Sequence, residues 1–107
     1  MFSPYRLTVP LSATSETEPY ATICFSVQAV ADCGLISRVL EQFAKRGLMP
    51  AKVVAASSGD VGLLDIDIQV PDLTLPDGEQ IARSLRAIVG VGVVLTSEKH
   101  GQRATRP

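Results

Sequence analysis

Cys33 is the residue of this 107-residue chain whose position could most directly support chemistry. It follows Asp32 at the start of an expected helix, where the positive end of the helix dipole favours the thiolate form of a cysteine. A reactive thiol usually also needs a basic partner or a second cysteine close by. The chain has one histidine, His100, near its end, and no Cys-x-x-Cys motif. A thiol-based activity at Cys33 is therefore a minor alternative.

A second cysteine and a pair of carboxylates complete the candidate groups. Cys24 lies within an expected strand, and a rise of about 3.3 Å per residue puts it roughly 20 Å or more from Cys33, so we expect two separate thiols. Asp65 and Asp67 share one face of another expected strand, where they could bind a metal ion, but solvated polar side chains are more typical of such a face. We therefore predict no catalytic residue, no metal site and no cofactor.

The composition limits the classes of function. A chain of this length suits one domain, and 46% hydrophobic residues with a mean hydropathy of +0.23 indicate a buried core. A net charge of −1 provides no attraction to nucleic acid or to an anionic membrane. No segment has the length of a transmembrane helix or the pattern of a secretory signal. We therefore expect a cytoplasmic protein with neither a nucleic-acid nor a membrane partner.

The strands and helices that must position these residues are predicted from the spacing of apolar residues. Apolar residues recur at every second position in a half-buried strand and at every third or fourth position in an amphipathic helix. The predicted strands are residues 20–30, 48–58, 61–70 and 91–97. The predicted helices run from residue 33 or 34 to 46 and from 77 to the residue before Gly90. A turn at 57–60 connects the two middle strands, and a loop over 71–76 precedes the second helix.

Each predicted helix has a start signal and an apolar stripe. Asp32 is the expected N-cap of the first helix, and Asp77 and Gln80 form an expected capping box at the start of the second. The residues that the first helix is expected to bury are Ile36, Val39, Leu40 and Phe43. Those of the second are Ile81, Ala82, Leu85, Ile88 and Val89.

The order β-α-β-β-α-β predicts an α+β fold, a ferredoxin-like sandwich with antiparallel sheet order 4-1-3-2. Right-handed crossovers place both helices on one face of the sheet. We expect the domain to span residues 20–98. Residues 1–19 are expected to form an N-terminal segment or linker that could include a short extra strand, and residues 99–107 a flexible tail.

The second strand indicates a protein partner. The predicted order places it at a sheet edge, where an uncovered apolar strand tends to pair with other chains. Lys52 is the only charge in a run that continues as Val53, Val54, Ala55 and Ala56. Pairing with the same strand of a second copy would cover this edge and form one continuous sheet. Residues 52–56 are therefore the expected homodimer interface.

The junction between the first strand and the first helix is the expected functional end. Unpaired N–H groups at a helix start can bind an anion, and Gly34 lets a ligand approach the backbone. From Ser26 to Leu48 the chain resembles the ACT domain family in its order of strand, short loop, glycine and Ser-Arg. It is most similar to the small regulatory subunit of acetolactate synthase, in which Pro-Gly-x-Leu-Ser-Arg-Val is common. The matching residues here are Cys33-Gly34-Leu35-Ile36-Ser37-Arg38-Val39.

This resemblance implies an amino-acid effector bound at the loop, across the interface of two domains set side by side. The expected ligand-binding residues are Ala31, Asp32, Cys33, Gly34, Leu35 and Ile36. Two positions depart from the family's pattern. Cys33 replaces the usual proline, and Ala31 stands where many members have an asparagine or aspartate that holds the effector.

The favoured hypothesis is a non-catalytic regulatory module, at least a homodimer, that binds a small amino acid and modulates a metabolic enzyme. An enzyme of branched-chain amino-acid biosynthesis is the target that the resemblance suggests. The alternative is an interaction or assembly subunit that binds no ligand.

Overall fold

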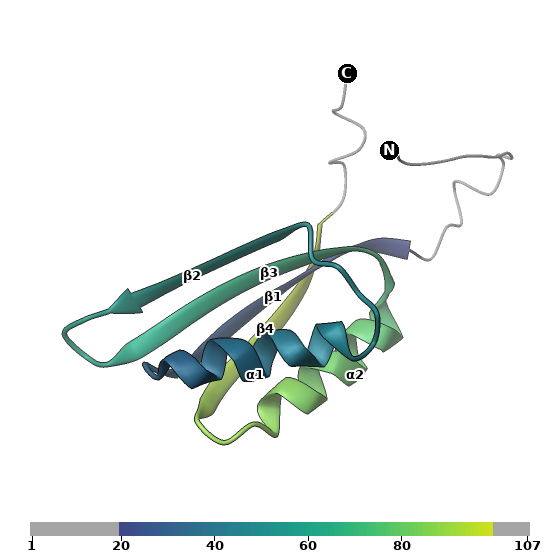
Figure 1. Cartoon of the computed structure of the whole chain (residues 1–107). Helices are drawn as coiled ribbons and strands as arrows, with labels where there is room; N and C mark the ends of the chain where they lie inside the picture. Colours follow the sequence, from purple (N-terminus) through teal and green to yellow (C-terminus); the bar gives the residue numbers. More distant parts are fainter. Residues whose placement is uncertain (1–19, 100–107) are drawn as a thin grey trace, which may run out of the picture.

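The computed structural model describes residues 20–99, which form a four-stranded antiparallel sheet with two helices on one face (Figure 1). The elements are β1 (Tyr20–Val30), α1 (Cys33–Ala44), β2 (Lys52–Ser58), β3 (Leu63–Thr74), α2 (Leu75–Arg86) and β4 (Val91–Lys99). The strand order β2-β3-β1-β4 is the predicted order read from the opposite edge. The ferredoxin-like fold is therefore confirmed. The predictions for residues 1–19 and 100–107 lie outside the described residues.

The two central strands, β1 and β3, supply most of the core. Their alternate side chains face the helices, and register pairs Phe25 with Ile68 and Val27 with Ile66. All four are at most 1% exposed, and burial of each such side chain contributes roughly 1.5–3 kcal/mol. Phe25 meets Phe43 of α1 edge to face, with ring centroids 5.2 Å apart. The sheet and α1 are thus joined through one aromatic contact at the centre of the core.

Helix α1 begins where the sequence predicts, but it buries a different stripe. Leu35 is 1% exposed and joins the core with Val39 and Phe43, whereas Ile36 and Leu40 are only half-buried. The predicted burial of Ile36 and Leu40 is therefore corrected. The physical reason is the placement of the helix, which packs against α2 and leaves the side nearest β2 uncovered.

Two strand boundaries differ from the predictions. β2 begins at Lys52 instead of residue 48, because Gly47 has a φ of +72° after α1 and Leu48 turns inward against the core. β3 starts at Leu63, after the turn, and continues to Thr74 through the predicted loop over 71–76. The pairing of β3 with β1 shifts register between Ala21 and Ile23, and this irregularity lets the longer β3 stay paired with β1 to its end.

Helix α2 starts two residues earlier than predicted. Its N-cap is Thr74, whose Oγ1 accepts a hydrogen bond from the Asp77 N–H at 3.3 Å, so the Asp77 capping box is wrong. Pro76 fits the first turn, where the missing N–H costs no hydrogen bond. The helix ends at Arg86, which leaves Val89 89% exposed instead of buried. Lys99, expected in the tail, is the last residue of β4.

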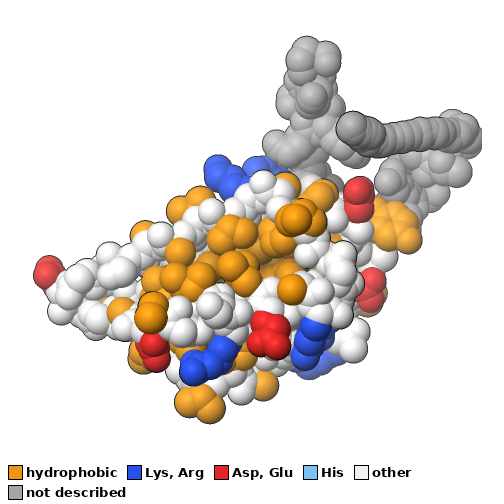
Figure 2. Space-filling view, in the orientation of Figure 1, with side chains coloured by type: hydrophobic (Ala, Val, Ile, Leu, Met, Phe, Trp, Pro, Cys, Tyr) orange, Lys and Arg blue, Asp and Glu red, His pale blue; other side chains and the backbone are white. Residues whose placement is uncertain are grey.

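Strand β2 stands clear of both helices, and all seven of its residues are exposed (Figure 1). Val53 and Ala55 lie opposite Ile68 and Ile66, so they face the helix side of the sheet without a helix above them. Figure 2 shows hydrophobic side chains gathered on this surface, between β2 and α1. We call this surface the apolar strip, and its residues are Ile36, Leu40, Leu48, Val53 and Ala55. Within residues 20–99, no helix is long and apolar enough to cross a membrane.

Candidate functional site

The predicted ligand-binding loop borders a groove of about 250 Å³ at the start of α1. We call this hollow the loop groove. Four of the six predicted residues line it, together with one residue from β2 and one from β3. The lining residues are Ala31, Asp32, Cys33, Ile36, Ser57 and Leu64. The loop groove therefore lies next to the exposed edge strand.

The other two predicted residues, Gly34 and Leu35, do not line the groove. Leu35 is buried, so its side chain anchors α1 and is not available to a ligand. A Cβ built at Gly34 would have Asp32 Oδ1, at 3.5 Å, as its nearest atom outside the adjacent residues and the backbone of the helix. Packing within this domain therefore does not require glycine at residue 34.

The polar groups of the loop are partly used within the loop itself. The Gly34 N–H donates to Asp32 Oδ1 at 3.0 Å, which confirms Asp32 as the N-cap. The Leu35 N–H donates to the Asp32 carbonyl at 2.9 Å. Of the three N–H groups at residues 33–35, only that of Cys33 has no hydrogen-bond partner in the described part of the chain. Among residues 20–99, Asp32 is also the only charged residue that lines the groove.

Both thiols are free, as predicted, with Cys33 exposed and Cys24 half-buried. Among residues 20–99, no basic side chain forms a hydrogen bond or an ion pair with Cys33. The same residues contain no group of three or more His, Cys, Asp or Glu arranged to hold a metal ion. Asp65 instead accepts a hydrogen bond from Gln28 Nε2 at 3.3 Å.

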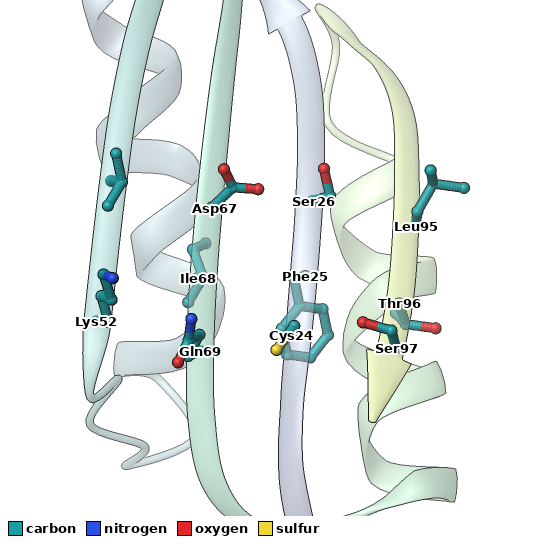
Figure 3. Close-up of a pocket in the computed structure, with 11 residues that line it drawn as sticks. Cys24, Phe25, Ser26, Lys52, Asp67, Ile68, Gln69, Leu95, Thr96 and Ser97 are labelled. Atoms are coloured by element: carbon teal, nitrogen blue, oxygen red, sulfur yellow. The ribbon is translucent and has the colours of Figure 1, made fainter. Parts of the chain in front are cut away.

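A second hollow, which we call the open-face trough, lies on the side of the sheet opposite the helices (Figure 3). Its volume is about 630 Å³, and two rows of side chains cross all four strands to form it. The first row is Val54, Asp67, Ser26 and Leu95. The second row is Lys52, Gln69, Cys24 and Ser97. The sequence alone does not indicate this hollow, because its residues come from four separate segments.

The predicted interface, residues 52–56, is exposed along its whole length. In the described part of the chain, β2 pairs only with β3, so its other edge offers N–H and C=O groups to a partner. An edge of this kind is suited to the addition of another strand.

Comparison with known proteins supports the fold. The ACT domain of a GTP pyrophosphokinase from Chlorobium tepidum superimposes with a TM-score of 0.63 at 12% identity, over 73% of this chain and 99% of that one. The C-terminal domain of the MgtC protein from Mycobacterium tuberculosis gives 0.62 at 14% identity, over 79% and 95%. A homoserine dehydrogenase from Thiobacillus denitrificans gives 0.62 at 13%, over 76% of this chain but only 18% of the dehydrogenase.

Sequence comparison identifies the family. Curated protein sequences give no match to the chain. The sequence profile of the ACT-like domain, in contrast, matches residues 16–102. This range includes every element of the fold, the loop groove and the open-face trough. The chain therefore belongs to the ACT-like domain family.

Proposed function

We propose that this chain is a cytoplasmic, non-catalytic regulatory module that acts as a homodimer and binds a small amino-acid effector in the loop groove. Membership of the ACT-like domain family supports a regulatory ligand-binding role. The observation that carries the proposal is the position of the groove beside β2, whose residues are all exposed. Because Ser57 of β2 lines the groove, a second copy that added its own strand would lie beside the site.

The position of the second copy follows from symmetry. Two identical antiparallel edge strands in one sheet are related by a two-fold axis, and residues directly opposite each other share a face of the sheet. Full pairing of Lys52–Ser58 with itself places Ala55 on this axis and Val53 of the second copy opposite Ser57. Ser57 lines the loop groove, so the second copy would close the groove with an aliphatic side chain.

The groove favours an aliphatic amino acid in a defined orientation. The ammonium group of the effector binds the Asp32 carboxylate, whose Oδ1 already accepts the Gly34 N–H, and the effector carboxylate accepts from the Cys33 N–H. Its side chain lies against Ile36, Leu64 and Val53 of the second copy. An effector that binds one dimer geometry more tightly than another shifts the equilibrium between them, and this shift would regulate an attached enzyme. An enzyme of branched-chain amino-acid biosynthesis is the target class that we propose.

Thermal unfolding in the presence of each proteinogenic amino acid, at millimolar concentration, tests the proposal. The bound effector should raise the Tm by about 4–8 °C for each kcal/mol that it adds to the free energy of unfolding at the concentration used. In a Cys24→Ser protein it should also slow the alkylation of Cys33, which lines the groove. The matched variant Asp32→Asn retains a capping side chain but lacks the charge, and it should lose the protection of Cys33 by the effector. If no amino acid changes the Tm or the rate of Cys33 alkylation, an effector role is excluded.

The exposed β2 edge also favours a second candidate function, an assembly subunit that binds no ligand. Light scattering separates the two functions when it is combined with the amino-acid screen. A stable dimer that responds to none of the amino acids would favour the assembly subunit.

A further inference from the structure

The open-face trough is formed by the four strands of one chain and does not depend on a second copy. Ser26, Cys24 and Ser97 are short side chains that leave the middle of the sheet hollow (Figure 3). Leu95 on β4 is 63% exposed and Val54 on β2 is 46% exposed, so apolar side chains stand at both edges of the trough. The trough therefore combines a polar floor with two apolar walls.

The charges in the trough have opposite signs and are not satisfied by each other. Lys52 lies opposite Gln69, and Asp67 lies one diagonal step away, a Cα separation of about 7–8 Å. Within residues 20–99, neither Lys52 nor Asp67 forms a hydrogen bond or an ion pair. A second cation approaches from β4, where Lys99 Nζ donates to Gln69 Oε1 at 3.4 Å. Gln69 thus has Lys52 opposite it on β2 and contacts the ammonium group of Lys99, and the free carboxylate of Asp67 lies two residues away on the same strand.

We propose that the open-face trough is a second ligand site, which binds a small zwitterion with an aliphatic side chain. The ligand carboxylate lies beside Gln69, between Lys52 and Lys99, and the ligand ammonium group binds Asp67 and the Ser26 hydroxyl. The Cα separation of Lys52 and Asp67 leaves room for an α-amino acid, whose two charged groups are adjacent and add a hydrogen-bond length at each end. Adjacent strands are about 4.8 Å apart, so an aliphatic side chain fits across β1 and contacts Leu95.

The charge arrangement selects a zwitterion over simpler ligands. A plain carboxylate would gain the two lysines but would face the unpaired Asp67. A plain amine would gain Asp67 but would face the lysines. Because the groups are exposed, each interaction is weak alone, and the selectivity comes from satisfying both signs at once. This site is on the face opposite the loop groove and is independent of the function proposed above.

Cys24 provides a native reporter for the experiment, because it lies in the floor of the trough. In a Cys33→Ser protein, the rate of Cys24 alkylation by iodoacetamide is measured by mass spectrometry in the presence of leucine, the probe ligand. Leucine should slow the reaction severalfold. Neither 4-methylpentanoate, which lacks the ammonium group, nor 3-methylbutylamine, which lacks the carboxylate, should match this protection at the same concentration.

Variants locate the effect. Lys52→Gln and Asp67→Asn should each remove the protection of Cys24 by leucine. The matched control Asp65→Asn removes the same charge from the same face of β3, two residues away and outside the trough, and should leave the protection unchanged. These residues are exposed, so circular dichroism should show an intact fold in all three variants.

Three results would overturn the proposal. The first is a rate of Cys24 alkylation that leucine does not change, and the second is protection of Cys24 by either analogue equal to that by leucine. The third is protection by leucine that persists in both the Lys52→Gln and the Asp67→Asn protein. The result is separable from that for the loop groove, which Cys33 reports in the Cys24→Ser protein. Backbone amide shifts from NMR provide a second readout. Leucine should shift the resonances of the two trough rows in the wild-type protein, and unchanged resonances in these rows would count against the site.

Discussion

The loop groove and the open-face trough lie on opposite sides of one sheet, and each contains one of the two cysteines. The groove is built mainly from neighbours in sequence, and two of the three N–H groups at residues 33–35 are already bonded to Asp32. The trough is built from four strands, and its charges at Lys52 and Asp67 have no partner within the described part of the chain. The loop before α1 thus uses most of its polar groups in its own hydrogen bonds, whereas the open face of the sheet presents charged groups that have no partner among residues 20–99.

The two hollows also differ in their dependence on a second copy. Ser57 of the edge strand β2 lines the groove, so a strand paired with the free edge of β2 would lie beside it and complete it. The trough already has walls on both sides, from Val54 and Leu95 of the same chain. Disrupting the dimer should therefore affect the two sites differently.

The largest expected effect comes from Ala55→Lys, which places two like charges on the proposed two-fold axis. Juxtaposed like charges cost several kcal/mol, so the dimer dissociation constant should rise about a hundredfold or more. Light scattering measures this change. Amino-acid protection of Cys33 should fall with the dimer, while leucine protection of Cys24 persists.

The matched control is Ala44→Lys, which adds the same charge at an exposed alanine of α1, outside the proposed interface residues 52–56. It should leave the dimer intact. A wild-type protein that is monomeric at all concentrations, or an Ala55→Lys protein as dimeric as the control, would contradict pairing through β2.

A second prediction tests the support of the loop groove. Gly90 has a φ of +101°, and a Cβ there would lie 3.1 Å from Leu35 Cδ1 and 3.2 Å from Val30 Cγ2. Gly90→Ala combines backbone strain with a clash against the side chain that anchors α1. The free energy of unfolding should fall by about 2–3 kcal/mol, measured by urea denaturation.

Gly59→Ala is the control for this prediction, since a Cβ at Gly59 meets nothing within 4 Å and its φ is not positive. Its stability should stay within about 0.5 kcal/mol of wild type. If the Gly90→Ala protein retains leucine protection of Cys24 but loses effector protection of Cys33, the two sites have separate supports. Equal losses at both sites would show that the sites depend on one packing unit.

The sequence predicted the groove better than the trough, for a physical reason. Asp32 and Gly34 act within three residues of the helix start, so their types alone indicate a cap and a loop. Predicting the trough requires the register in which the strands pair. Lys52 lies opposite Gln69, and Gln69 lies opposite Cys24, only after three strands have paired. Alternation in β1 and β3 could predict which residues face away from the core, but not which of them share a row.

Helix burial shows the same limit. The apolar residues of α1 form a stripe wide enough to include Leu35, Ile36, Val39 and Leu40, and periodicity alone does not say which edge of the stripe is covered. That depends on whether the helix lies over β2 or against α2, which is a property of the assembled fold. Similarly, Thr74 and Asp77 are both capable N-caps three residues apart, and the longer β3 selected the first.

The smallest expected effect separates the structural role of Asp32 from its proposed role in ligand binding. Asp32→Ala removes the acceptor of the Gly34 N–H, so unfolding free energy should fall by about 1 kcal/mol. Asp32→Asn keeps an amide oxygen at the same place, so its unfolding free energy should fall by at most a few tenths of a kcal/mol. Both variants lack the carboxylate that binds the effector ammonium group, so both should lose effector protection of Cys33. The effector could instead protect Cys33 from alkylation equally well in the Asp32→Asn protein and in the wild type. In that case Asp32 serves only as a helix cap, and the loop groove recognises its ligand without a charge.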